Sequence, residues 1–124
     1  MKATHGLTLI ELMVVVAILS IISAIAVPAY TGYIRTGLES ECLNEIAAIR
    51  LAEEEYFLQF NAYIPASANA TAIRTNSNNL YIPSTAVTAA TANCTFAVST
   101  AAGYTITATG TNKLPATYTK VVPK

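Results

Sequence analysis

The chain has 124 residues, enough for one small domain, and its seven basic and seven acidic side chains balance. Charged residues make up only 11% of it, which excludes the dense basic surface typical of a nucleic-acid-binding domain. Aspartate is absent, and the single histidine, His5, precedes the first apolar segment. We therefore expect no histidine-based catalytic or metal site in the folded part.

The N-terminal sequence combines a short polar leader with a long apolar segment. Residues 1–6 carry Lys2, and residues 7–29 are almost entirely apolar. As a helix of roughly 23 residues, this segment would span about 34 Å, close to the thickness of a bilayer core. Glu11 lies near its start, where a carboxylate costs less than the about 2.5 to 3.5 kcal/mol expected at the membrane centre. Thr8 and Glu11 also have the spacing of a capping box.

The helical pattern continues beyond the apolar segment. Pro28 is expected to kink or loosen the helix rather than to end it. After it, apolar side chains recur at helical spacing at Leu38, Cys42, Ile46, Ile49, Tyr56 and Phe60. The pattern predicts one long helix over residues 8–60, whose first half lies in a membrane and whose second half packs on a domain.

The remaining residues predict a loop followed by strands. Residues 61–93 are rich in Ala, Thr, Asn and Ser and predict a surface loop with a short strand at 80–82. Apolar and polar residues then alternate over 95–99 and 104–109, which predicts a hairpin turning at 100–103. A third strand is expected at 118–122. Together these elements predict an α+β fold, a long N-terminal helix packed on a small three- to four-stranded antiparallel sheet.

Three interpretations compete for residues 7–29. A secretory signal peptide would be cut after Ala24-Ile25-Ala26 and leave Val27 as the new N-terminus. A plain signal anchor would stay uncut. Neither gives Glu11 more than a capping role. Cleavage after Gly6 would place an α-amino group on Leu7, whose charge, or that of an adjacent copy, could neutralise Glu11 in an apolar setting. The acid would then serve assembly.

The sequence GLTLIEL at residues 6–12, followed by an unbroken apolar run and Pro28, resembles the class III signal of type IV pilins and pseudopilins. The resemblance implies that a prepilin peptidase cuts between Gly6 and Leu7 and methylates the new N-terminus at Leu7. It also implies that Glu11 guides docking into a growing filament. Tyr30 and Tyr33 lie where pilins have aromatic residues. The resemblance covers about the first 35 residues and is only architectural beyond them.

The same resemblance implies an organisation for the whole chain. A leader, 1–6, would be removed; 7–29 would form the transmembrane and filament-core helix; 30–124 would form the globular domain. The expected partners are further copies in a helical filament, the prepilin peptidase and methyltransferase, an assembly ATPase with its inner-membrane platform, and the membrane itself. One departure is Ser20, which stands where many pilins have a glycine that favours local melting of the helix.

The function implied is a structural subunit of a type IV pilus, stored as a single-pass inner-membrane protein and then displayed in an extracellular filament for adhesion, twitching motility or DNA uptake. A minor pilin and a type II secretion pseudopilin are alternatives within the family. A monomeric membrane-anchored or secreted binding domain is the alternative from another class.

The two cysteines are expected to pair. Cys42 lies on the apolar helix face and Cys94 just before a strand, and the N-terminal segment indicates an exported, oxidising location. A bridge would close a loop of roughly 50 residues, worth about 4 kcal/mol in the chain-entropy model. Two reduced thiols and a metal site are the alternatives, and a metal site lacks histidine or aspartate to complete it.

Other motifs have structural explanations. Residues 53–55, three consecutive glutamates, predict a solvated helix face with one inward-leaning member rather than a cation site. Asn69 and Asn93 each begin an Asn-x-Thr triplet, which is common by chance. The aromatic residues are expected to serve packing rather than electron transfer.

The basic residues of the domain are few and scattered, which disfavours nucleic-acid binding; they include Arg74, Lys113, Lys120 and Lys124. No nucleophile and base occur together in a recognisable pattern. We expect no catalytic residues, no cofactor and no metal, and therefore a protein that is not an enzyme.

Overall fold

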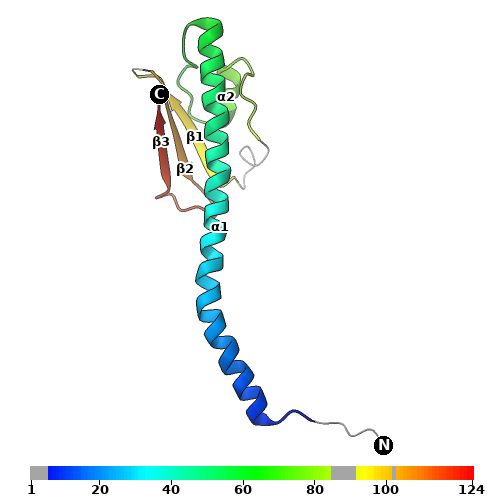
Figure 1. Ribbon diagram of the computed structural model, residues 1–124. Coiled ribbons are helices and arrows are strands. Elements are labelled where there is room, and N and C mark those ends of the chain that lie inside the picture. Colours follow the sequence, from blue (N-terminus) through cyan, green and yellow to red (C-terminus); the bar gives the residue numbers. More distant parts are fainter. Residues whose placement is uncertain (1–5, 85–91, 102) are drawn as a thin grey trace, which may run out of the picture. The chain divides into compact units, whose positions relative to one another are not determined.

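A computed structural model of the chain describes residues 6–84, 92–101 and 103–124. The chain divides into two units, Met1–Ile34 and Arg35–Lys124. Helix α1 (Leu9–Phe60) contributes to both (Figure 1). Pro28 lies inside α1, and the helix continues past it, so the proline does not end the element. Whether it kinks the helix stays a prediction.

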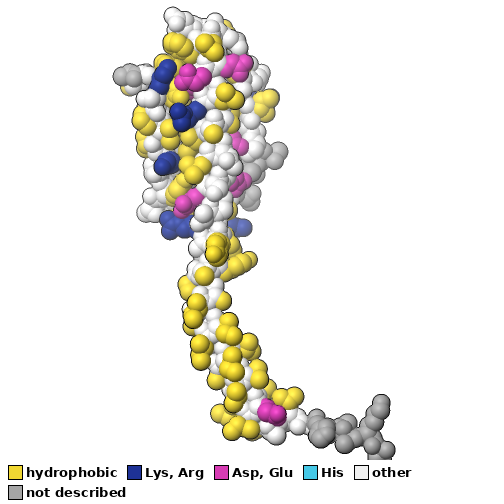
Figure 2. Space-filling view, in the orientation of Figure 1, with side chains coloured by type: hydrophobic (Ala, Val, Ile, Leu, Met, Phe, Trp, Pro, Cys, Tyr) yellow, Lys and Arg dark blue, Asp and Glu magenta, His cyan; other side chains and the backbone are white. Residues whose placement is uncertain are grey.

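The first unit consists of the apolar part of α1. Every described side chain from residue 6 to residue 34 is exposed, including Leu9 at 77% and Ile25 at 72%. By length and composition this helix could cross a membrane, and none of its most apolar stretch is buried within the chain. Figure 2 shows the apolar side chains following one another along this stretch. Such a surface requires another apolar environment to cover it.

The second unit is an α+β domain, which confirms the predicted fold class. After α1 come α2 (Ala70–Asn76), β1 (Cys94–Ser99), β2 (Thr105–Gly110) and β3 (Thr119–Pro123) (Figure 1). The three strands form one antiparallel sheet in the order β1-β2-β3. In its register, Phe96 lies opposite Ala108 and Ile106 lies opposite Val122.

The domain core lies between α1 and the sheet. Alternate residues of β1 and β2 are buried, as the period of a strand requires, so Phe96, Val98 and Ile106 all point to one face. The helix contributes Cys42 and Ile46, together with other residues at helical spacing, to the same cluster. The predicted apolar face was wrong at its far end: Phe60 is 49% exposed and packs on Tyr56 at 4.6 Å between ring centroids.

The segment between α1 and β1 differs from the predicted surface loop. It contains α2, whose N-cap Asn69 accepts a hydrogen bond from the backbone N–H of Ala72 at 2.8 Å. Several of its apolar side chains are buried, with Ile64 and Ile73 fully inaccessible to solvent. These residues complete the core beside the sheet, because three short strands and one helix face leave apolar surface uncovered.

The strand predicted at residues 80–82 was wrong. Asn78 and Asn79 have positive φ angles of 53° and 63°, which turn the chain sharply just before it. The backbone N–H of Tyr81 then donates to Ser77 Oγ at 3.2 Å instead of to a neighbouring strand. The pairing partner of the sheet edge is Ser67, which forms an isolated bridge with Val98 of β1. The predicted loop also includes residues 85–91, which lie outside the described residues.

Candidate functional site

The start of α1 is closed by a reciprocal pair of side chains. Glu11 Oε2 accepts hydrogen bonds from the backbone N–H of Thr8 at 2.8 Å and from its hydroxyl at 2.7 Å. The backbone N–H of Glu11 donates in return to Thr8 Oγ1 at 3.3 Å. This is the capping box that the sequence predicts, and it holds the carboxylate within one helical turn of Leu7.

Gly6 and Leu7 precede this cap outside the helix. A Cβ atom added to Gly6 would meet no atom within 4 Å, so the fold itself does not require glycine at this position. The Leu7 side chain is 78% exposed. Residues 1–5 of the predicted leader lie outside the described residues.

The middle of the apolar segment is helical throughout. Ser20 Oγ donates to the carbonyl of Ala17 at 2.8 Å, and Thr31 Oγ1 donates to the carbonyl of Pro28 at 2.9 Å. These hydroxyls are satisfied within their own helix, which lets polar side chains remain in an apolar segment. The proline has no N–H to donate, so it weakens the hydrogen-bond ladder one turn earlier.

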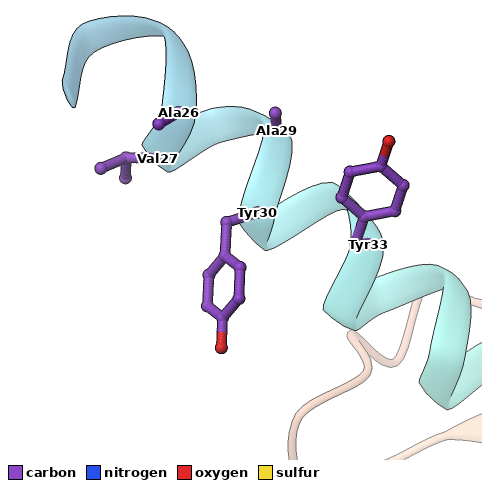
Figure 3. Close-up of a pocket in the computed structure, with 5 residues that line it drawn as sticks. All are labelled: Ala26, Val27, Ala29, Tyr30 and Tyr33. Carbon is purple, nitrogen blue, oxygen red and sulfur yellow. The ribbon is translucent and has the colours of Figure 1, made fainter. Parts of the chain in front are cut away.

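A shallow apolar groove occupies the end of the first unit (Figure 3). The groove is lined by Ala26, Val27, Ala29, Tyr30 and Tyr33, and the two phenol rings point away from the helix in different directions. The tyrosines are 67% and 78% exposed. Among the described residues, the groove is lined by no Asp, Glu, His, Lys or Arg side chain, and its only polar side-chain atoms are the two phenol oxygens.

Cys42 and Cys94, which are 52 positions apart in the sequence, form the predicted disulfide, with their Cα atoms 6.0 Å apart. Both cysteines are almost fully buried. The bridge joins α1 to the first residue of β1, so it holds the helix and the sheet together across the core.

Glutamates on the inner side of α1 hold the segment between α1 and β1. Glu45 Oε2 accepts from the hydroxyl of Tyr81 at 2.9 Å, and its Oε1 accepts from the backbone N–H of Ser84 at 3.2 Å. One turn earlier, Glu41 Oε2 accepts from Asn93 Nδ2 at 3.2 Å. These bonds join residues 36 to 52 positions apart.

Glu53 is the inward-leaning member of the three consecutive glutamates. Its side chain is fully buried, and Oε2 accepts from the backbone N–H of Ile64 at 2.9 Å. Its Oε1 atom has no hydrogen-bond partner in the described part of the chain. Burial raises the pKa of Glu53, and burial together with the acceptor Glu45 raises the pKa of Tyr81.

Sequence reasoning missed the buried Glu45, although a signal for it existed. Glu45 and Glu53 share the helical spacing of Cys42, Ile46 and Ile49, so both fall on the inner face of α1. A carboxylate on that face requires hydrogen-bond donors from another segment, and residues 61–93 are the nearest in sequence to supply them.

Two of the scattered basic side chains, Lys124 and Arg74, and both asparagines of the Asn-x-Thr triplets have local partners. Lys124 Nζ bonds to the Tyr63 hydroxyl and lies 4.9 Å from the centre of the Phe57 ring, and the bond to Tyr63 raises the pKa of Lys124. Arg74 Nε donates to Asn79 Oδ1 at 3.0 Å. Of the two triplet asparagines, Asn69 caps α2 and Asn93 binds Glu41. Across residues 6–84, 92–101 and 103–124, no three side chains of the metal-binding types come together.

Comparison with known families identifies the N-terminal segment. Residues 1–27 match the model of the prokaryotic N-terminal methylation motif. The matched range contains Gly6, Leu7 and Glu11 and ends directly before Pro28. No solved structure gives a significant match to the chain.

Curated relatives are fimbrial proteins. The chain is 39% identical over 92 residues to fimbrial protein EcpC of Eikenella corrodens, an alignment that covers 74% of the chain and 60% of the relative. It is 48% identical over 52 residues to a type IV major alpha-pilin of Moraxella bovis, covering 42% and 33%. It is 34% identical over 80 residues to a probable minor fimbrial protein of Dichelobacter nodosus, covering 64% and 50%. The chain thus spans three fifths or less of the length of these relatives.

Proposed function

We propose, from the premise that this chain is a homologue of the type IV pilins, that it is a structural subunit of a type IV pilus. One observation carries the proposal. The first part of α1, residues 9–34, is almost entirely apolar and exposed on all sides, and it leads into a domain that already has its own closed core. Such a helix is suited first to lipid and then to the centre of a bundle of identical helices.

Processing would take place at the helix start. A prepilin peptidase would cut between Gly6 and Leu7 and methylate Leu7. The open space around Gly6 supports this assignment, because the need for a small residue there then comes from the enzyme and not from the fold. The cut would leave the capping pair of Thr8 and Glu11 in place.

Assembly would use the same carboxylate. Within one chain, Glu11 accepts bonds only from Thr8 among the described residues, and these bonds engage one of its two oxygens. The other oxygen could pair with the methylated α-ammonium on Leu7 of an adjacent subunit. In an apolar bundle this pairing would set the axial position of each incoming helix. In any other register the Glu11 carboxylate and the Leu7 ammonium would both be buried without an opposite charge beside them.

Filament growth requires external work. Lipid tails are as apolar as leucine, so moving the helix from a bilayer into a bundle gains little hydrophobic free energy. This supports an assembly ATPase and a membrane platform as partners. Once the helix is outside the membrane, returning it to water would cost about 1.5 to 3 kcal/mol for each large apolar side chain, which would keep the filament together.

The mass of the mature protein tests the proposal. Loss of residues 1–6 with the gain of one methyl group is expected. A new N-terminus at Val27 would instead support secretion, and an uncut chain would support a signal anchor. Imaging of surface fibres from cells with and without the chain then separates a filament subunit from a monomeric anchored domain.

The relatives include one named as a major pilin and one named as a probable minor fimbrial protein, so a minor pilin is the second candidate function. Antibody labelling of fibres separates the two. Labelling along the whole fibre supports a major subunit, and sparse or terminal labelling supports a minor one.

A further inference from the structure

The uncharged part of α1 has a sharply defined aromatic end. Residues 12–34 contain no charged side chain, and Arg35 follows directly. No aromatic residue occurs in the first 29 residues, and then Tyr30 and Tyr33 appear within one turn. The chain therefore changes from purely aliphatic to aromatic and then to charged over a few residues.

The position of this change matches the thickness of a bilayer. From Leu9, the first residue of α1, to Tyr30 the helix rises about 32 Å at 1.5 Å per residue, against about 30 Å for a hydrocarbon core. When the capped end at Thr8 and Glu11 lies at one face of the core, the two tyrosines lie at the other.

The geometry of the tyrosines suits an interface between lipid and water. Both rings are largely exposed, and they point in different directions away from the helix with their hydroxyls outermost (Figure 3). Below them the surface is formed by Ala26, Val27 and Ala29, which bear no polar atoms in their side chains. A tyrosine places its ring among the upper acyl chains and its hydroxyl among the lipid carbonyl and phosphate groups.

We propose that Tyr30 and Tyr33 are interfacial anchors that hold the stored subunit at a fixed depth, with the glycerol and head-group layer of the outer leaflet as their partner. This inference rests on the membrane-stored stage of the proposed function. It assigns the groove of Figure 3 to lipid before assembly. The two tyrosines are three residues apart on neighbouring positions of one helix face, both are largely exposed, and they lie at the distance from Leu9 where the hydrocarbon core ends, which favours the head-group layer as the partner.

Fluorescence quenching tests the depth directly, because the chain contains no tryptophan. Tyr30→Trp is compared with the control Leu19→Trp in full-length protein, in phosphatidylcholine vesicles brominated either near the head groups or near the chain ends. The indole at position 30 should be quenched more strongly by the shallow bromines, and that at position 19 by the deep ones. The anchor proposal would be wrong if the two positions show the same depth, or if the indole at position 19 is quenched and the indole at position 30 is not. No quenching at either position would overturn the membrane-stored stage as well.

A second pair of measurements removes the anchors themselves. In the Leu19→Trp background, Tyr30→Leu with Tyr33→Leu keeps this part of the helix apolar and removes both phenol groups. The depth of the helix should then no longer be fixed, so the indole at position 19 should be quenched about equally by the shallow and the deep bromines. Ile25→Leu in the same background is the matched control, because Ile25 is an exposed aliphatic residue that does not line the groove, and it should leave the quenching profile of position 19 unchanged. An unchanged profile in the double variant would refute the anchor. Quenching at position 30 that falls as the protein-to-lipid ratio rises would assign the groove to a second copy of the chain instead.

Discussion

The backbone N–H of Ile64 donates a 2.9 Å hydrogen bond to Oε2 of Glu53, which joins the first residues after α1 back onto the helix. The carboxyl is fully buried, and its other oxygen lacks a hydrogen-bond partner among the described residues. An ionised group in this place is costly, because burial removes its hydration and only one donor replaces it. The pKa of Glu53 is raised for that reason.

Glu53→Gln should stabilise the domain at neutral pH and flatten its pH dependence. Because the folded pKa lies above the unfolded one, the stabilising contribution of Glu53 is complete at low pH and disappears as pH rises through the folded pKa. Glutamine keeps an oxygen for Ile64 and cannot ionise, so we expect a gain on the order of 1 kcal/mol at neutral pH. Urea unfolding of the full chain in detergent across acidic and neutral pH measures it.

Glu55→Gln is the control for this change, since Glu55 is exposed two residues away. It should leave the pH slope of the unfolding free energy as it is. A Glu53→Gln slope equal to that of the unmodified chain would contradict the prediction.

Tyr81→Phe should destabilise the domain by about 1 to 3 kcal/mol. The substitution removes the hydroxyl that donates to Glu45 and leaves one oxygen of a nearly buried carboxylate without its partner. Thermal unfolding monitored by near-ultraviolet circular dichroism measures the loss. Tyr30→Phe is the control, because that side chain is exposed and the change should stay within about 0.5 kcal/mol. Equal midpoints for the two variants would show that the Glu45 bond adds nothing.

Cys42→Ser with Cys94→Ser should lower the unfolding free energy by about 4 kcal/mol, the chain-entropy value for a loop of this length. Reduction of the unmodified protein should produce a similar loss, and the double variant should not respond to reductant. Denaturant titrations with and without reductant measure both. If the reduced and oxidised proteins unfold at the same denaturant concentration, the bridge does not stabilise the domain.

Gly6→Val should block processing and leave a full-length, membrane-bound precursor. The fold has open space for the larger side chain, so failure would originate in the peptidase and not in misfolding. Gel mobility of membrane fractions reports the outcome. Gly37→Ala also enters open space and should be processed normally. Normal shortening of the Gly6→Val chain would remove the assigned cleavage site.

Glu11→Ala should insert and be cleaved normally but enter filaments poorly when it is the only copy. Removing one partner of a desolvated ion pair leaves the other charge, here the Leu7 ammonium, buried and unpaired at a cost of about 3 to 5 kcal/mol. Sheared surface filament at matched membrane levels measures incorporation. Thr8→Val is the control, because it removes the hydroxyl of the cap and keeps the carboxylate. Loss of a cap alone costs about 1 kcal/mol, so this variant should assemble nearly normally. If Glu11→Ala gives the wild-type yield of filament, Glu11 serves only as a helix cap and the assembly role is wrong.

The sequence by itself determined the features that depend on local spacing. The capping pair Thr8 and Glu11 marks the start of α1, and apolar residues at helical spacing carry it to Phe60. Alternation predicts β1 and β2 with Phe96 and Ile106 inward. The pairing of the two cysteines followed from an exported location and their places on a helix face and a strand. For the cap, the helix and the strands the physical cause lies within a few residues along the chain, whereas the pairing of the cysteines, 52 positions apart, depended on the inferred oxidising location.

Only the tertiary structure decided what happens between α1 and β1. With seven residues, α2 is too short to be stable alone or to show a clear period, and its stability depends on the burial of Ile73. Glu45 and Tyr81 are 36 residues apart, and neither residue type predicts burial. The Glu45 carboxylate can be buried because the distant Tyr81 hydroxyl donates a hydrogen bond to it in place of water. The Tyr81 hydroxyl can be buried because the carboxylate accepts that bond. Such mutual satisfaction exists only once the fold has brought both groups together.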